Sequence, residues 1–561
     1  MTRLIECVPN FSEGRDMSII KQITNVVEAV DGVKLLDVDP GAATNRTVVT
    51  FVGEPEPVLE AAVRAVRKAA ELIDMSKHKG EHPRFGATDV CPLVPIAGVT
   101  MEECVGYARE LGRRLGEENG TTVFCYENAA FSDQRRNLAV VRAGEYEGLE
   151  KKLKDPAWQP DFGPGKFNPR SGATAVSARD FLVAYNVNLN TTSTRRANAI
   201  AFDVREKGRI KREGGELEGK IVKDADGNPV WEPGMLECVK GIGWFIEEFG
   251  VAQISMNLTN ISVTPVHVAF DACCERAQAR GIRATGSELV GLIPLQAMLD
   301  AGRYFLRKQE RSTGVADSEL IKIAVKSMGL DELYPFKPEE KIIEYAIAAD
   351  SGQKKLVDLS LRGFVEETAS ESVAPGGGSV SAAIGAMGAA LGAMVANLSS
   401  HKRGWDDRWE EFSDQAEKAK ACHDEMLRLV DGDTDAFNQI MAAFRLPKST
   451  EAETAARHAA IQAATKQAID VPFRTMQVAL ASMDPIKKMA EIGNPNSASD
   501  AGVGALCAHT AARGAFLNVQ INTGDLEDKD LVRDYLERGA AILEQCQQLE
   551  TETLELVRKH I

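Results

Sequence analysis

The pattern of apolar residues changes near residue 315, and this change limits the folds open to the chain. Before it, short apolar runs bounded by Pro, Gly, Asn and Asp, typical of strands, alternate with stretches of helical spacing. After it the strand signals vanish, and from residue 357 only long helical periods remain. The 561 residues are too many for one core. The pattern predicts an α/β part followed by an all-α domain.

The order β-α-β-β-α-β occurs twice in the first part, in residues 1–126 and 180–294. It predicts a multi-domain protein whose N-terminal part consists of two similar βαββαβ-type subdomains, with helices covering the sheets. The expected strands are Leu4–Val8, Val33–Val38, Thr47–Val52, Val90–Ile96, Thr122–Tyr126, Phe181–Leu189, Val239–Phe245, Ala252–Leu258 and a run within 284–294. The expected helices are 16–30, 55–75, 101–118, 192–206, 265–280 and 295–308. The predicted domains are 1–179, 180–312, a helical linker 313–356, and 357–561.

The all-α domain opens with a stretch made almost wholly of Ala, Gly, Met and Val, residues 379–398. A transmembrane helix is one interpretation of this stretch. Because Ala and Gly give little transfer energy and no second span follows, a helix buried among its partners is the favoured interpretation, with no transmembrane segment. The further helices are expected at 406–431, 433–443, 450–482, 499–523 and 529–559.

The chain carries a net charge of −16, which disfavours nucleic acid as a partner. Its ten cysteines form no C-x-x-C pair, which indicates a reducing compartment. The N-terminal residues contain no long apolar stretch of the kind found in signal peptides. We therefore expect a cytoplasmic protein.

Two of the eight histidines, His78 and His82, lie in the polar segment 77–96. Pro83 and Gly86 argue against a continuing helix, so this segment is expected to be a loop between a helix and a strand. Imidazole suits proton transfer near neutral pH. Two alternatives remain open: a surface loop without a role, and a metal site, which is disfavoured because the H-E-x-x-H pattern is missing.

Two motifs of the all-α domain carry polar groups. Gly376, Gly377 and Gly378 precede Ser379 at a predicted helix start, where backbone amides can hold an anion. Residues 429–437 place three carboxylates, Asp431, Asp433 and Asp435, at alternating positions. They can raise one another's pKa and supply an acid–base pair.

Each of these motifs also has an interpretation without a functional role. The glycines can be a flexible entry into the helix, and the carboxylates a solvated helix end. The carboxylates do not form a calcium loop, because the twelfth position from Asp431 is Ala442. The polar turn 493–505 can line a ligand pocket between helices.

Two further segments are predicted to be irregular. Residues 155–176 are rich in Pro and Gly and are expected to form a long functional loop. Residues 208–236 are charged and rich in Gly, and are expected to form an exposed hairpin or excursion.

Several segments resemble glutamate formiminotransferase: ECVPNFSEG (6–14), LLDVDPGAATNRTVVTFVG (35–53), DMSKHKGEHPRFGATDVCPLVPI (74–96), WQPDFGPGKFNPRSGATA (158–175), NVNLN (186–190), KGIGWF (240–245) and SELVGLIPLQAMLDA (287–301). VAPGGGSVSAAIGAMGAALGAMV (373–395) and VDGDTDAF (430–437) resemble formimidoyltetrahydrofolate cyclodeaminase. Together, in this order, they resemble the bifunctional formiminotransferase-cyclodeaminase family over nearly the whole chain. Residues 208–236 look longer than the vertebrate pattern of this family, a departure that can alter assembly.

The resemblance implies two successive reactions of histidine degradation. The formimino group of N-formimino-L-glutamate moves to N5 of tetrahydrofolate, and glutamate is released. The 5-formiminotetrahydrofolate then closes to 5,10-methenyltetrahydrofolate with loss of ammonia. The co-substrate would be a folate polyglutamate, no metal is implied, and the assembly would be a homo-oligomeric ring, often an octamer.

The resemblance also implies residue roles. The family's catalytic histidine falls on His82 and its catalytic aspartate on Asp433. We hypothesise that Arg46 and Arg84 clamp substrate or folate carboxylates, or form structural ion pairs instead. Asp39 and Asp89 are candidates for orienting the imidazole or holding the pterin, and residues 376–379 for binding substrate. The family's folate segment falls on Gly163, Pro164, Gly165, Lys166, Phe167, Asn168, Pro169, Arg170, Ser171 and Gly172.

Three alternatives compete with a bifunctional enzyme. The helical domain can resemble a methenyltetrahydrofolate cyclohydrolase, or serve only to form oligomers. The whole chain can also be an acidic scaffold without chemistry, although this leaves the histidine loop unexplained.

Overall fold

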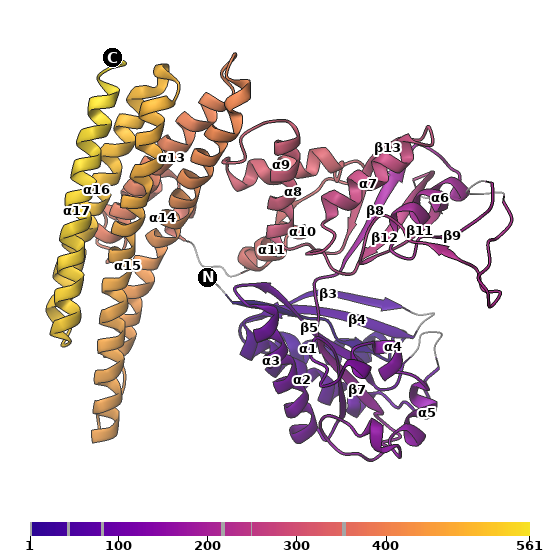
Figure 1. Ribbon diagram of the computed structural model, residues 1–561. Coiled ribbons are helices and arrows are strands. Elements are labelled where there is room, and N and C mark those ends of the chain that lie inside the picture. The colour runs from indigo at the N-terminus through magenta and orange to yellow at the C-terminus, as the bar shows by residue number, and fades with distance from the viewer. Residues whose placement is uncertain (1–2, 42–44, 80–83, 215–218, 248, 351–354) are drawn as a thin grey trace. The chain divides into compact units, whose positions relative to one another are not determined.

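The computed structural model describes residues 3–41, 45–79, 84–214, 219–247, 249–350 and 355–561. The chain divides into two compact units, Met1–Ala297 with Met328–Ile347, and Met298–Ser327 with Ala348–Ile561. The first unit contains sheets and helices, and the second contains helices (Figure 1). The predicted order, α/β followed by all-α, is confirmed. The predicted domain boundaries stay predictions, although residues 298–327 group with the helical unit.

The first sheet is mixed. Its antiparallel part runs in the order β3, β4, β1 with β2, and β5; β7 and β6 continue beyond β5 in parallel. The strands are β1 (Leu4–Cys7), β2 (Asn10–Phe11), β3 (Val33–Gly41), β4 (Arg46–Gly53), β5 (Thr88–Ala97), β6 (Thr122–Glu127) and β7 (Ala173–Ala178). Strands β1 and β2 share the place between β4 and β5, on either side of Pro9.

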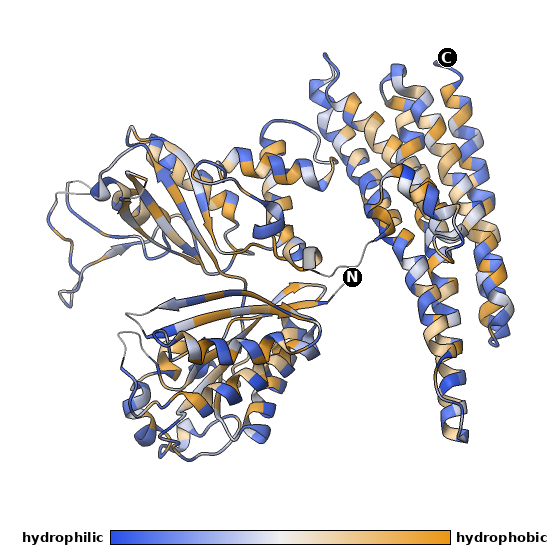
Figure 2. Ribbon diagram, turned by 180° about the vertical axis from the view of Figure 1, so that it is seen from behind, coloured by the Kyte–Doolittle hydropathy of each residue, from blue (hydrophilic) through white to orange (hydrophobic). Residues whose placement is uncertain are grey.

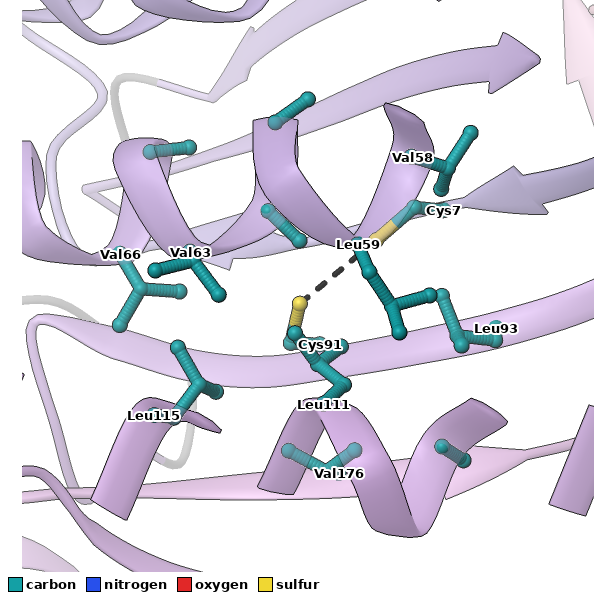
Figure 3. Packing of buried hydrophobic residues seen from close by; sticks show 14 of the residues in the cluster. Cys7, Val58, Leu59, Val63, Val66, Cys91, Leu93, Leu111, Leu115 and Val176 are labelled. Carbon is teal, nitrogen blue, oxygen red and sulfur yellow. Dashed lines mark hydrogen bonds between the residues drawn. The ribbon is translucent and has the colours of Figure 1, made fainter. Parts of the chain in front are cut away.

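Three helices cover one face of this sheet: α1 (Met17–Glu28), α2 (Pro55–Leu72) and α3 (Met101–Glu118). Side chains alternate across a strand, so one face of β1 reaches the core. Figure 3 shows Cys7 of β1 beside Leu59 of α2, with Cys91 and Leu93 of β5 nearby. The opposite face of β5, β7 and β6 packs on a smaller cluster that includes Phe85, Phe124 and Leu149.

The second sheet is antiparallel, in the order β11 (Val239–Ile246), β12 (Val251–Leu258), β8 (Val183–Leu189) and β13 (Ala284–Val290). Helices α6 (Thr194–Val204) and α7 (Val266–Gln278) pack on it. Counted along the chain, the strand order is 2-3-1-4, as in the antiparallel part of the first sheet. The predicted pair of βαββαβ subdomains is thus confirmed, and both have the ferredoxin-like arrangement.

Two predictions in this unit need correction or refinement. The predicted loop 155–176 ends too late, because β7 begins at Ala173. Small residues hid this strand from the apolar-run test, although all its residues are buried. The excursion 208–236 contains a two-stranded sheet of β9 (Arg209–Ile210) and β10 (Trp231–Glu232), which agrees with the predicted hairpin. Helices α4 (Leu138–Val141), α5 (Glu145–Lys152), α10 (Pro338–Lys341) and α11 (Ile343–Asp350) complete the unit.

The second unit is dominated by long helices (Figure 1). These are α13 (Gly377–Ser400), α14 (Trp409–Phe444), α15 (Glu451–Ile492), α16 (Ala498–Asn522) and α17 (Lys529–Val557), with shorter α8 (Leu295–Lys308), α9 (Asp317–Met328) and α12 (Leu361–Thr368) before them. In Figure 2 these helices alternate between hydrophilic and hydrophobic residues along their length, as amphipathic helices in a bundle do.

The prediction of two helices, 406–431 and 433–443, is wrong, since α14 runs unbroken through Gly432. One glycine inside a helix costs about 1 kcal/mol, which the packing of α14 on α13 and α15 outweighs. Helix α15 likewise extends ten residues beyond the predicted end at 482, through the buried Pro485.

Helix α13 is, within the described residues, the one helix long and apolar enough to cross a membrane by composition. Of its most apolar window, 61% is buried inside the protein. Its Gly385, Gly388 and Gly392 lie against side chains or backbone of α14, α15 and α16, where a Cβ would meet atoms at 2.8–2.9 Å. This close packing agrees with the predicted buried helix.

The core of the first unit yields a stability prediction. Ile23 of α1 is fully buried, so Ile23→Ala should lower the free energy of unfolding by about 2–5 kcal/mol. Ile221 is 40% exposed, and Ile221→Ala is the control, with an expected loss below about 1 kcal/mol. Urea unfolding of the full chain, followed by circular dichroism, measures both. Equal losses for the two variants would contradict this packing.

Candidate active sites

The histidine loop follows α2 and leads into β5, as predicted. His82 falls in residues 80–83 and lies outside the described residues, so its role stays a prediction. The first part of the loop, which ends at Lys79, is hydrogen-bonded to Asn45, the residue before β4. Asn45 donates from Nδ2 to the carbonyl of Lys79 at 3.0 Å, and its own Oδ1 accepts from the amide of Gly14 at 3.1 Å. Asn45 directly precedes Arg46, the first residue of β4, so this contact joins the loop to the start of that strand.

His78 has both ring nitrogens engaged. Arg84 donates from Nε to Nδ1 at 3.2 Å, so Nε2 carries the proton and donates to the carbonyl of Asn45 at 2.9 Å. Burial, together with the nearby Arg84, lowers the pKa of His78 below its usual value. His78 is therefore neutral near pH 7 and positions the loop.

Arg84 is buried and paired within the first unit. Its guanidinium donates to Glu147 Oε1 at 2.8 Å and Oε2 at 3.0 Å, and to Glu145 at 3.2 Å. Hydrogen bonding to Glu147 raises the pKa of Arg84. Of the two alternatives drawn from the sequence, a substrate clamp or a structural ion pair, this geometry favours the ion pair.

The predicted folate segment, 163–172, is an exposed loop whose last residues join the histidine loop. Ser171 accepts from the amide of Ala87 at 2.8 Å, and Phe85 accepts from the amide of Ala173 at 3.0 Å. Gly172 has a φ of +65°, and a Cβ there would lie 2.2 Å from the carbonyl oxygen of Phe85. The structure thus brings the two predicted segments together, and only glycine fits this contact.

A cavity of about 970 Å³ lies in the first unit, lined by residues of both sheets. Asp39 of β3 and Arg46 of β4 are in its wall, beside Arg179 and Lys341. Residues 163–172 do not line it among the described residues. Its volume is within the range of small-ligand sites, and its charged wall suits a polar ligand.

Asp89 is fully buried at the start of β5, near Arg46. Its Oδ1 accepts from the amide of Phe85 at 3.1 Å, and Oδ2 lies 3.3 Å from the guanidinium of Arg142. Burial raises the pKa of Asp89 to about 6, against the opposing charge of three arginines, Arg142 first. The carboxylate links the histidine loop to the arginines beneath it, in agreement with an orienting role.

The second site is inside the helical unit, where Asp433 of α14 meets the start of α13. Its Oδ2 accepts from the backbone amide of Ser379 at 2.9 Å, and the Ser379 hydroxyl lies 3.1 Å from the same oxygen. Oδ1 makes no hydrogen bond to a described residue. A carboxylate is stable at a helix N-terminus, whose amides carry partial positive charge. Burial nevertheless raises the pKa of Asp433, with Ser379 opposing.

The glycines before Ser379 make room for this contact. A Cβ on Gly378 would lie 2.1 Å from Asp433 Oδ1, and a Cβ on Gly377 would lie 3.3 Å from Nδ2 of Asn518 on α16. The structure therefore unites the two predicted motifs, and Gly376 lies open beside them. Asn518 was not singled out in the sequence, since one polar residue in a helical period carries no signal.

The other candidates of the helical unit lie apart from this pair of motifs. Asp431 accepts from the backbone amide of Leu356 at 2.7 Å, and Asp435 is exposed. The turn 493–505 lies at the other end of α16, whose first residue, Ala498, is about 30 Å from Asn518 at 1.5 Å per residue. Neither Asp431 nor the turn completes the Asp433 site. Among the described residues, no group of three or more His, Cys, Asp or Glu side chains is placed to hold a metal ion.

Three family models match the chain. The N-terminal subdomain of the formiminotransferase domain matches residues 4–179, and the formiminotransferase domain matches 184–348. The formiminotransferase-cyclodeaminase model matches residues 360–558.

Curated relatives cover either the whole chain or parts of it. Formimidoyltransferase-cyclodeaminase of Gallus gallus is 43% identical over 560 residues, which is 100% of this chain and 99% of the relative. Glutamate formimidoyltransferase of Thermoplasma acidophilum is 42% identical over 54% of this chain and 92% of the relative. Methenyltetrahydrofolate cyclohydrolase of Methylorubrum extorquens is 35% identical over 35% of this chain and 95% of the relative.

The contact between Gly378 and Asp433 yields a prediction. In Gly378→Ala, the new methyl group overlaps the carboxylate, and the free energy of unfolding should fall by about 1–3 kcal/mol. Gly376→Ala is the matched control, because no atom lies within 4 Å of its Cβ.

A double-mutant cycle assigns the clash to its partner. Removing the carboxylate in Asp433→Ala should abolish most of the loss caused by Gly378→Ala, because the overlapping atoms are gone. Urea unfolding of the four proteins gives the coupling energy. Additive losses would show that the two residues do not meet.

Proposed function

The chain belongs to the formiminotransferase-cyclodeaminase family, and we propose that its two units catalyse two successive steps on one folate. The first unit transfers the formimino group of N-formimino-L-glutamate to N5 of tetrahydrofolate and releases glutamate. The helical unit converts 5-formiminotetrahydrofolate to 5,10-methenyltetrahydrofolate and ammonia. Relatives carrying both activities in their names align over 94–100% of the chain. The observation that carries the second step is the carboxylate of Asp433 held at the start of α13.

The first reaction needs one group to move a proton in each direction. N5 of tetrahydrofolate attacks the formimino carbon and loses its proton, and the departing glutamate nitrogen gains one. An imidazole with a pKa near neutrality can accept the first and donate the second, and we assign this role to His82. Support comes from the residues on either side of it in the loop. Lys79 is hydrogen-bonded to Asn45, and Phe85 is hydrogen-bonded to Asp89.

Substrate binding is assigned to the groups around this loop. Arg46, in the cavity wall, is suited to pair with a carboxylate of formiminoglutamate or folate, with Asp39 opposite in charge beside it. Residues 163–172 are proposed to bind folate beside the histidine loop, to which their last residues are hydrogen-bonded. Arg84 is proposed to act through His78, which it contacts, rather than on the substrate.

The second reaction closes a ring and expels ammonia. N10 attacks the formimino carbon and loses a proton, and the former imino nitrogen leaves as ammonia after gaining protons. Asp433 can take part in either transfer, because one oxygen is held by Ser379 while Oδ1 remains available. The open amides at Gly376, Gly377 and Gly378 are proposed to bind the substrate. We propose that neither reaction uses a metal, since each exchanges one C–N bond for another with proton transfers that side chains can carry out.

The wider setting follows from the family. We propose a cytoplasmic homo-oligomer, an octameric ring, that takes folate carrying a polyglutamate tail. The helical unit offers surface for subunit contacts, because apolar side chains of α13 and α16 are exposed. These include Met387 (51%), Leu398 (48%), Leu517 (67%) and Ile521 (74%).

A second candidate for the helical unit is hydrolysis of the methenyl ring, as the name of one 35% identical relative states for that protein. A cyclohydrolase would consume 5,10-methenyltetrahydrofolate and release no ammonia. Ammonia therefore distinguishes the two functions.

One assay tests both steps. Purified protein receives tetrahydrofolate and formiminoglutamate, while glutamate, ammonia and the ultraviolet absorbance of 5,10-methenyltetrahydrofolate are followed. His82→Ala should lower glutamate release at least about 100-fold, and Asp433→Ala should release glutamate but lower ammonia formation by at least about 100-fold. Asp435→Ala, an exposed aspartate on the same helix, is the control and should keep both activities. Glutamate release without ammonia from the wild type would exclude the cyclodeaminase.

A further inference from the structure

Glu6 is a buried carboxylate in the wall of the first unit's cavity, and the mechanism above leaves it without a task. It belongs to β1, between β4 and β5, where it lies opposite Val52 and Val94. Only 5% of its surface is exposed. Its neighbours on the strand, Ile5 and Cys7, point into the helix-covered core, as Figure 3 shows for Cys7. The alternation of the strand therefore turns Glu6 to the cavity, whose lining includes it.

No described residue satisfies this carboxylate. It makes no hydrogen bond and no ion pair within 4 Å among the described residues, although Arg179 is near enough to act on it electrostatically. Burial raises the pKa of Glu6 to about 7, and Arg179 opposes the rise. A buried carboxylate without partners destabilises the fold, so its presence on a central, rigid strand indicates that something outside the chain binds it.

The cavity limits what that group can be. An ionised carboxylate accepts two parallel hydrogen bonds from a planar N–C–N edge, the geometry it forms with a guanidinium. Flat apolar walls suit such a ring or amidine, and Val8, Phe181 and Leu182 line the same cavity. Arg46 and Arg179 in the same wall suit the anionic groups of a ligand instead. A ligand with a donor edge at one end and a carboxylate at the other would therefore bind in one orientation.

We propose that Glu6 is a positioning residue that binds the N–C–N donor edge of a substrate of the transferase. This inference rests on the proposed function, which supplies two such edges. One is the formimino group itself, and the other is the 2-amino-4-oxo edge of the pterin. Glu6 would fix the orientation of that edge by hydrogen bonding and would not itself exchange a proton in the reaction.

The test compares Glu6→Gln with Glu340→Gln. Glutamine keeps the size of Glu6 but presents an N–H donor to a donor edge. Glu340 also lines the cavity but is exposed and accepts from Lys337 at 2.8 Å, so it controls for the change of charge. Titration calorimetry with tetrahydrofolate alone probes the pterin, and the KM for formiminoglutamate probes the formimino group.

Glu6→Gln should weaken one of these two by about 10- to 100-fold, the loss expected for a charge-assisted hydrogen bond, with kcat changed less than threefold. Weaker tetrahydrofolate binding identifies the pterin, and a raised KM for formiminoglutamate alone identifies the formimino group. The melting temperature should stay the same or rise, since a desolvated charge is removed.

Two results would overturn the inference: unchanged affinity for both substrates, or a lowered melting temperature with equal losses for both substrates, which would mark a structural role. A wild-type protein without glutamate release would instead refute the proposed function, and this outcome is separate. Ammonia formation from added 5-formiminotetrahydrofolate should be equal in all three proteins and checks that the helical unit is intact.

Discussion

The three long helices α1, α2 and α3 of the first unit lie on one face of its first sheet, while the short α4 and α5 reach only part of the other face, and the rest of this unit depends on that asymmetry. Alternation along β1 sends Ile5 and Cys7 into the core with α2, and by the same geometry it sends Glu6 to the other side. On a sheet covered on both faces, such a residue would be apolar. The cavity with Asp39 and Arg46 lies on the side of the sheet opposite α1, α2 and α3, where polar side chains can face a ligand or water.

The helical unit differs, since its amphipathic helices pack their apolar faces together. The polar groups of its candidate site lie at a helix start, where the backbone amides of α13 have no partner within the helix. Asp433 supplies one from α14, and glycine at 378 is required because a side chain would occupy the position of the carboxylate. One oxygen of Asp433 thus caps the start of α13, which is a structural role. The other oxygen remains available for chemistry.

Much of this was predictable from the sequence, because it depends on local periodicity. The two βαββαβ orders and the helical end follow from the spacing of apolar residues. Family resemblance pointed to the segment of Gly376–Ser379 and to Asp433 separately, and their contact was not predicted. The predictions that were wrong concern elements whose formation depends on tertiary packing. Gly432 did not end α14, and the small residues of β7 were not recognised as a strand. The ion pairs of Arg84 and the nearness of Asn518 to Gly377 join residues distant in sequence, which a single sequence does not reveal.

Glu6 is a buried acid and Asp433 a half-buried one, and both have raised pKa values, yet their surroundings assign them different roles. Asp433 accepts a backbone amide and contacts a hydroxyl, so its charged form is partly compensated before any ligand arrives. Within the described part of the chain, Glu6 has only the electrostatic effect of Arg179, and we infer that its charge is compensated when donors enter the cavity. A group already held by the protein can exchange a proton without moving, whereas a group lacking partners gains most from binding. The first arrangement suits catalysis, and the second suits recognition.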